Sequence, residues 1–205
     1  MMKNVTFEAK SLEEAKTQAE TLLRVHRDYI DFDTTEKRGM FGFKKSYHVE
    51  ATVNVDPATF GHNLLKTLFA DMGIDAEINV ETPNESEVRF HISTDANPVM
   101  IGKNGKTLDS LQVYMRNLLN IFTEERLIVF VDIGGYKENR RRQLEILATK
   151  TAKEVAKTKT AAKLDPMNAY ERRIIHTKLA DWRDVITKSE GERQKRYVVI
   201  KPKEK

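Results

Sequence analysis

The sequence predicts an α+β protein of three small domains, over residues 1–52, 53–135 and 136–205. A chain of 205 residues has room for two or three small domains. Hydrophobic periodicity gives the orders β-α-β-β and then α-β-β-α-loop-α-β in the first two segments. Gly134 and Gly135 then interrupt the chain, and a third segment of two helical patterns and two strands follows.

The first segment begins with residues 5–8, which alternate like a short strand. Ser11 and Glu14 then form a capping box, which predicts a helix from there to about Val25. Two further alternating stretches are expected to be strands: residues 29–35 and 47–53.

The connection between those two strands carries three bulky apolar residues around two glycines: Met40, Phe41 and Phe43. These side chains could complete the small core of the first domain. They could also form an exposed apolar tip that binds a protein partner. The sequence leaves both interpretations open, so these residues are a candidate partner loop.

The second segment opens with Asp56 and Pro57, which suit an N-cap and a first helical position. The helix is expected to end at Gly73. Three runs have the composition of strands: residues 74–80, 88–92 and 127–133. Apolar residues at helical spacing from Leu108 to Phe122 predict a further helix between the last two runs.

The third segment begins with a helical pattern from Lys137, and Asp165 and Pro166 are expected to start a second helix. Two short strands are expected at residues 185–188 and 196–200, joined by a turn around Gly191.

Charge is distributed very unevenly among the segments. Residues 1–52 hold 9 basic and 9 acidic residues, residues 53–136 hold 6 and 12, and residues 137–205 hold 20 and 10. Concentrated positive charge favours a polyanion partner, because lysine and arginine release counterions when they bind phosphates. A basic segment that only aids solubility is the alternative.

Composition and spacing point away from an enzyme and from a bound cofactor or metal. The chain has no cysteine, which excludes disulfides, thiolate nucleophiles and CxxC zinc sites. Its five histidines are dispersed, and no serine lies in a GxSxG turn. The N-terminus lacks the apolar run of a signal peptide, and no stretch approaches a membrane span. We therefore expect a cytoplasmic protein without membrane insertion.

The sharpest motif is a loop in which two glycines bracket two polar residues: Gly102, Lys103, Asn104 and Gly105. Glycines let the backbone approach a phosphodiester, and the following helix N-terminus supplies free N–H groups. Lys103 and Lys106 add positive charge. A nucleotide-hydrolysing P-loop would need glycine where Met100 stands, so that interpretation is disfavoured. A plain turn between helices is the structural alternative.

A second candidate site lies on the helix after Pro166. Arg172 and His176 are four residues apart and so share one helical face, where they could contact a phosphate or a base edge. Arg173 lies between them in the sequence. A generic helix can hold an arginine and a histidine at this spacing, which is the structural alternative.

These motifs carry a family resemblance. The order α-β-β-α-GxxG-α-β resembles the type II KH domain, in which this loop clamps single-stranded nucleic acid. The third segment resembles the RxxxH domain, which is associated with single-stranded nucleic acid. Together with the glycine-containing loop at residues 38–44, the three modules resemble the bacterial Jag (SpoIIIJ-associated) family over essentially the whole chain.

The resemblance implies a cytoplasmic, non-enzymatic RNA-binding regulator linked to bacterial cell elongation and division. It implies binding to single-stranded RNA through residues 102–106 together with Arg172, Arg173 and His176. It also implies a small single-KH protein partner, recruitment to cell-elongation proteins, and the formation of homodimers. The alternative is a protein-interaction adaptor that dimerises through the KH-like segment, an interpretation that the acidic balance of this segment favours.

Overall fold

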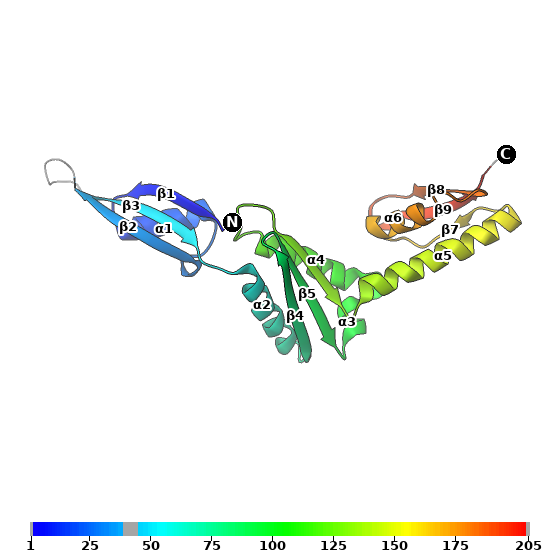
Figure 1. Cartoon of the computed structure of the whole chain (residues 1–205), viewed down its shortest axis with the longest axis horizontal. Coiled ribbons are helices and arrows are strands. Elements are labelled where there is room, and N and C mark those ends of the chain that lie inside the picture. The colour runs from blue at the N-terminus through cyan, green and yellow to red at the C-terminus, as the bar shows by residue number, and fades with distance from the viewer. Residues whose placement is uncertain (1, 39–44, 204–205) are drawn as a thin grey trace. The chain divides into compact units, whose positions relative to one another are not determined.

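The computed structural model describes residues 2–38 and 45–203 (Figure 1). The chain has the α+β fold class expected from the sequence, and the described strands form three separate three-stranded sheets. Two compact units contain these sheets, Met1–Gly134 and Gly135–Lys205. The candidate partner loop at Met40, Phe41 and Phe43 lies outside the described residues.

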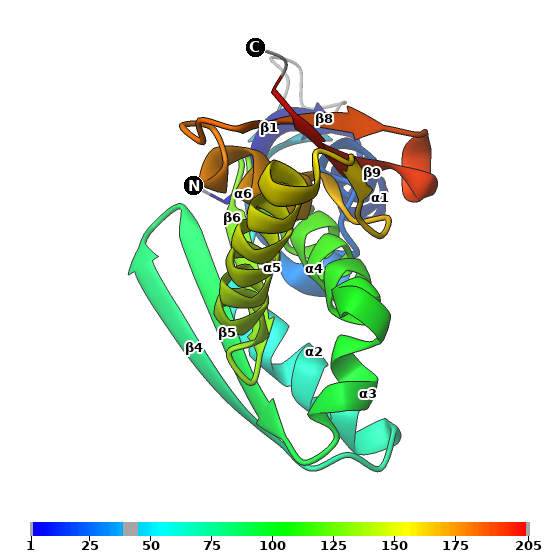
Figure 2. The same cartoon turned by 90° about the vertical axis from the view of Figure 1, so that its right-hand side faces the viewer.

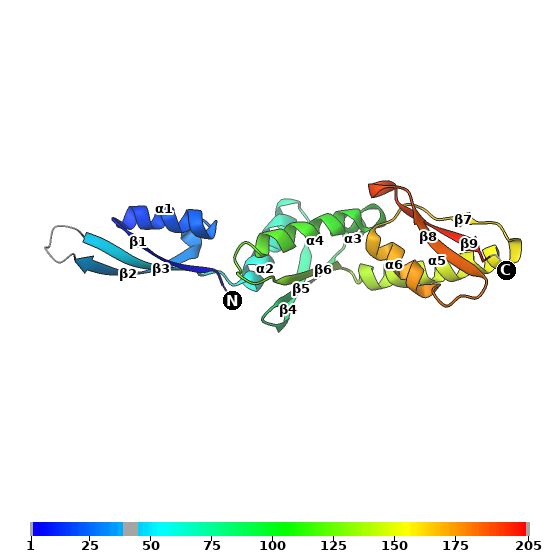
Figure 3. The same cartoon turned by 90° about the horizontal axis from the view of Figure 1, so that it is seen from above.

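The N-terminal segment, residues 2–53, forms an antiparallel sheet with the order β1-β3-β2. Its elements are β1 (Asn4–Ala9), α1 (Leu12–Leu23), η1 (Arg27–Tyr29), β2 (Ile30–Arg38) and β3 (Lys45–Val53). Figure 3 shows α1 along one face of this sheet. The helix begins directly after the predicted N-cap Ser11, whose Oγ accepts from Glu14 N–H. Glu14 Oε2 accepts from the N–H of Lys10, one residue before the N-cap, so only the serine half of the predicted capping box forms.

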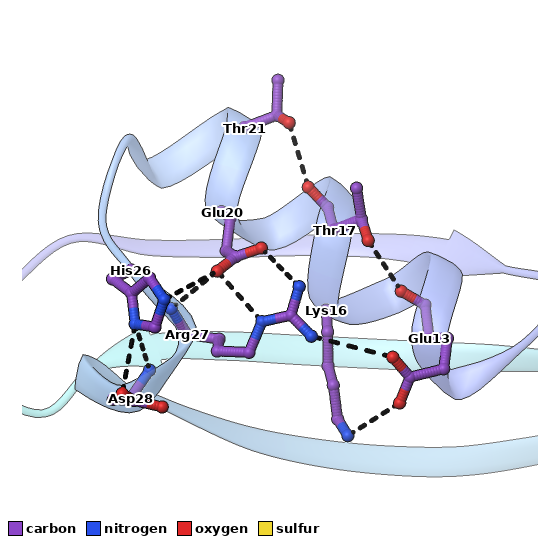
Figure 4. Close-up of polar contacts among 8 residues, drawn as sticks. All are labelled: Glu13, Lys16, Thr17, Glu20, Thr21, His26, Arg27 and Asp28. Atoms are coloured by element: carbon purple, nitrogen blue, oxygen red, sulfur yellow. Dashed lines mark hydrogen bonds and ion pairs between the residues drawn. The ribbon is translucent and has the colours of Figure 1, made fainter.

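A polar network fixes the turn that follows α1 (Figure 4). Arg27 Nε and Nη2 donate to the two carboxylate oxygens of Glu20, at 3.0 and 2.8 Å. These hydrogen bonds lower the pKa of Glu20 to about 2. Arg27 also lies 3.7 Å from a carboxylate oxygen of Glu13, and His26 Nδ1 accepts from Asp28 N–H. The network satisfies its own charges and therefore stabilises the turn.

The central segment, residues 54–134, has the predicted order α-β-β-α-loop-α-β. Its elements are α2 (Pro57–Asp71), β4 (Ala76–Asn84), β5 (Glu87–Thr94), α3 (Asn97–Ile101), α4 (Lys106–Leu119) and β6 (Ile128–Ile133). The sheet has the order β4-β5-β6, in which β5 pairs antiparallel with β4 and parallel with β6. Gly61 lets α2 approach the sheet closely, because a Cβ at this position would collide with the ring of Phe90.

The N-terminal and central segments share a core within the first unit. Phe122, which follows α4, is 4% exposed and packs with Tyr29 and Phe60 at ring-centroid distances of 5.9 and 4.9 Å. Lys3 N–H donates to the Phe122 carbonyl oxygen, at 3.1 Å. Because β3 ends at Val53 and α2 begins at Pro57, the chain leaves no room for a long linker here.

The C-terminal unit is built on α5 (Tyr136–Thr158) and α6 (Ala169–Lys178), which pack together (Figure 2). Its sheet has the order β7-β9-β8, from β7 (Ala162–Lys163), β8 (Val185–Glu190) and β9 (Tyr197–Pro202). The core comes from both helices and the sheet, with Leu144, Ile175 and Ile200 each at most 2% exposed.

Candidate nucleic-acid interface

The GxxG loop connects α3 to α4 through backbone that favours glycine. Gly102 has φ +71° and Gly105 has φ +74°, and Asn104 between them adopts the left-handed region at φ +54°. A Cβ at Gly102 would collide with the side chain of Thr107 in the first turn of α4. Glycine is therefore required at Gly102 by both conformation and space.

The loop presents its polar residues to solvent at the start of a 14-residue helix. Lys103, Asn104 and Lys106 are exposed, whereas Gly105 is buried. The N–H groups of Gly105 and Lys106 donate to the carbonyl oxygens of Gly102 and Lys103. The N-cap of α4 is Gly105, which makes no side-chain capping bond, so the next N–H groups of the first turn have no side-chain cap at the positive end of the helix dipole. This combination suits a phosphate group.

Apolar residues near the loop divide into two classes. Leu108 on α4 and Phe90 on β5 are fully buried and belong to the core. Val99 on α3 is 68% exposed and Ile101 is half-buried. Of the apolar side chains near the motif, these two on α3 are therefore available to contact a base.

The second candidate site is centred on α6, where both signature residues are tied to their surroundings. Arg172 Nη1 donates to the carbonyl oxygen of Met167, at 2.8 Å. The two ring nitrogens of His176 are hydrogen-bonded to hydroxyls on β8, Nδ1 to Thr187 Oγ1 at 2.6 Å and Nε2 to Ser189 Oγ at 2.8 Å. His176 thus joins helix to strand.

A buried ion pair holds the same helix against α5. Glu171 is 4% exposed, and its Oε1 accepts from Arg140 Nε at 2.7 Å. Its Oε2 accepts from Asn168 N–H, while Asn168 Oδ1 accepts from Glu171 N–H, which completes a capping box. The helix therefore begins at Ala169, and not directly after Asp165 as the sequence predicted, because Asn168 supplies the cap.

Comparison with known proteins decides the family. Residues 142–202 match the family of RxxxH domains, which is named for its Arg-x-x-x-His signature. The chain is 35% identical over 204 residues to the RNA-binding protein KhpB of Clostridium symbiosum, which covers 97% of this chain and 91% of the relative. It is 31% identical over 209 residues to the RNA-binding protein KhpB of Bacillus subtilis (strain 168), which covers 98% of this chain and 100% of the relative. The chain belongs to the KhpB family.

A shorter match concerns a longer member of the family. The RNA-binding protein KhpB of Lactiplantibacillus plantarum is 33% identical over 136 residues, which cover 66% of this chain and 42% of that protein. The expected kinship with Jag proteins is confirmed, and the domain match at residues 142–202 confirms the RxxxH-type segment.

In this KhpB-family chain the predicted site residues form two groups. Residues 102–105 form the connection between α3 and α4 in the first compact unit, with the 3-10 turn η2 at Lys103–Gly105, and Lys106 is the first residue of α4. Arg172, Arg173 and His176 lie on α6 of the second. Arg172 and His176 are half-buried, whereas Arg173 is exposed.

Sequence reasoning missed the residues that hold the α6 group in place. Thr187 and Ser189 follow His176 by 11 and 13 positions, and Arg140 precedes Glu171 by 31. The one signal that the sequence offered is the expected strand at residues 185–188, which contains Thr187 and ends directly before Ser189.

The environment of His176 disfavours its charged form. Burial lowers the pKa of the imidazole, and the nearby positive charge of Arg172 lowers this pKa further. His176 therefore acts near neutral pH mainly as a hydrogen-bonding group rather than as a cation.

The three consecutive arginines of α5 are all ion-paired. Arg140 pairs with Glu171, Arg141 Nε lies 3.1 Å from Glu145 and Arg142 Nε lies 3.1 Å from Glu138. These pairs reduce the contribution of this run to the positive surface. The sole tryptophan, Trp182, is partly buried and packs against the core, as a hydrophobic lid would.

The described residues were searched for a metal site and for a membrane-spanning helix. Within residues 2–38 and 45–203, no group of three or more histidine, cysteine, aspartate or glutamate side chains could hold a metal ion. The same part of the chain has no helix with the length and apolar character of a membrane span.

Proposed function

We propose that this protein is a non-enzymatic regulator that binds single-stranded RNA through two surfaces. The GxxG loop clamps the RNA backbone, and the RxxxH-type segment adds a second, basic contact. The loop carries the proposal: two glycines at positive φ and the left-handed Asn104 meet the uncapped start of α4 beside exposed Lys103 and Lys106.

Two further observations support the proposal. Relatives that align over nearly the whole chain carry the name RNA-binding protein KhpB. Residues 137–205 hold 20 basic against 10 acidic residues, which favours a polyanion. Because residues 53–136 hold 12 acidic against 6 basic residues, affinity at the GxxG loop has to come from the loop itself.

The resemblance to Jag proteins extends the proposal to cellular context. The regulator would act in the cytoplasm on cell elongation and division, with a small single-KH protein as partner. Recruitment to elongation complexes and homodimer formation belong to the same proposal, as does the division into domains at residues 52 and 135.

A second candidate function is a protein-interaction adaptor that docks or dimerises through the central segment. The acidic balance of that segment favours it, as do Val113 and Tyr114 on α4, which are 44% and 52% exposed. An apolar interface responds weakly to salt, whereas phosphate contacts lose affinity steeply as salt rises.

Two measurements test the proposal. Crosslinking in cells followed by sequencing should recover RNA above the level of an uncrosslinked control. Full-length protein should bind single-stranded oligonucleotides with a strongly negative slope of log affinity against log salt. Recovery of no RNA, with no salt-dependent binding in solution, would favour the adaptor.

A further inference from the structure

The solvent-facing side of α6 carries an aromatic residue and a cation at neighbouring positions. The side chain of Tyr170 is 62% exposed. Among the described residues of the C-terminal unit, no other aromatic side chain is exposed to this degree. Arg173, three residues on, is also exposed. Residues three apart in a helix are surface neighbours, so the two side chains share one patch.

The helix geometry places Arg173 at the middle of this outward side. Ile175 and Glu171 are buried, and they define the side that faces the core. At about 100° per residue, Arg173 points opposite to them, between Tyr170 and the flank that carries His176. The exposed positions four residues before and after Arg173 hold the small residues Ala169 and Thr177.

Charge on this outward side is positive. The acidic residue of α6 is Glu171, which is buried and paired with Arg140. Arg172 and His176 are tied to Met167, Thr187 and Ser189. The signature pair thus orients the helix, while the exposed neighbours face any ligand.

We infer that Tyr170 stacks on a base of bound single-stranded nucleic acid while Arg173 contacts the adjacent phosphate. This inference rests on the proposed RNA-binding function and names the contact residues of its second surface. Aromatic side chains beside cations are the usual means by which proteins hold unpaired bases without sequence preference. Tyrosine offers this contact at low entropic cost, because its ring has few rotatable bonds.

The alternative use of an exposed tyrosine is a protein contact. An apolar protein partner would cover the tyrosine ring. It would also remove water from Arg173 without supplying a carboxylate to pair with the guanidinium, which is energetically costly. A phosphate next to a base satisfies both side chains together, which favours nucleic acid as the occupant.

The test measures binding of the full-length chain to oligouridine and to an abasic strand of equal length. Tyr170→Ala should weaken binding to oligouridine about fivefold or more, since loss of one stacked base costs this much. Tyr170→Phe should bind like the wild type, because the ring is retained. On the abasic strand, wild type and Tyr170→Ala should bind equally.

Ile146→Ala is the matched control, because Ile146 is an apolar side chain on α5 of the same compact unit and is 68% exposed, against 62% for Tyr170. It should leave binding to both strands unchanged. Arg173→Gln should weaken binding to both strands and reduce the slope of log affinity against log salt by about 0.7, as one lost phosphate contact predicts.

Two outcomes separate failure of this inference from failure of the proposed function. If the wild type binds oligouridine and Tyr170→Ala binds within about twofold of it, the stacking assignment is wrong and RNA binding stands. If the wild type binds neither strand, the proposed function fails and the inference with it. An equal loss on both strands for Tyr170→Ala would also overturn stacking.

Discussion

Removing the buried carboxylate of Glu171 should destabilise the C-terminal unit and loosen α6. Glu171→Ala leaves the Arg140 guanidinium without its acceptor and the Asn168 N–H without its cap partner. Breaking a buried ion pair typically costs about 3–5 kcal/mol. The Arg140 side chain is 23% exposed, so water can solvate part of the freed charge. We expect a loss of about 2–4 kcal/mol in the free energy of unfolding.

The single tryptophan makes this measurement specific to the unit. Trp182 packs against the core that contains Ile175 of α6, so its fluorescence during urea unfolding reports on this unit. Glu138→Ala is the control, because Glu138 is 57% exposed and pairs with Arg142, itself 70% exposed. Its effect should be within about 1 kcal/mol.

A second pair of variants separates charge from capping. Glu171→Gln keeps an oxygen for Asn168 N–H and should lose less stability than Glu171→Ala. Replacing both Glu171 and Arg140 by Met should be more stable than the Arg140→Met single variant, because no unpaired charge remains buried. If Glu171→Ala unfolded within about 1 kcal/mol of the wild type with an unchanged dependence on urea, the ion pair would not be what holds α6 in place.

Three further predictions concern the loop, the histidine and the N-terminal segment. Lys103→Asp combined with Asn104→Asp should repel phosphate and lower single-stranded RNA affinity at an unchanged melting temperature, since both residues are exposed; unchanged affinity would contradict the clamp. Because the pKa of His176 is lowered in the fold, its contribution to stability is present above about pH 6.5 and is lost as pH falls through the folded pKa. Between about pH 7.5 and 5, His176→Asn should therefore lose less unfolding free energy than the wild type does, as measured by Trp182 fluorescence in urea. Deleting residues 1–53 should lower the melting temperature of the central segment by uncovering Phe60 and Phe122, and calorimetry showing no change would exclude the shared core.

The local signals in the sequence determined most of the fold. A capping box is a local signal that predicts a helix start independently of tertiary contacts. Helix α1 begins directly after Ser11, as expected. Asp56 and Pro57 likewise start α2. The GxxG loop follows from the same kind of evidence, because tolerance of positive φ is a property of glycine itself.

Weak local signals explain what was missed in the fold. The strand β7 has only two residues, too few for any periodicity, and it exists because it pairs with β9. The strand β2 extends to Arg38, beyond the expected end at residue 35, because β3 continues to pair with it. Pairing between strands is a long-range interaction, and it can extend a strand over residues that the local sequence pattern does not predict as strand.

The placement of the signature residues on α6 was decided by tertiary structure alone. Spacing places Arg172 and His176 on one helical face, but it does not say whether that face meets solvent or another element. The structure turns His176 toward Thr187 and Ser189 on β8 and leaves Arg173 exposed. Ile175 is buried in the core, and this packing, which depends on residues far apart in the chain, sets which polar side chains of α6 are exposed.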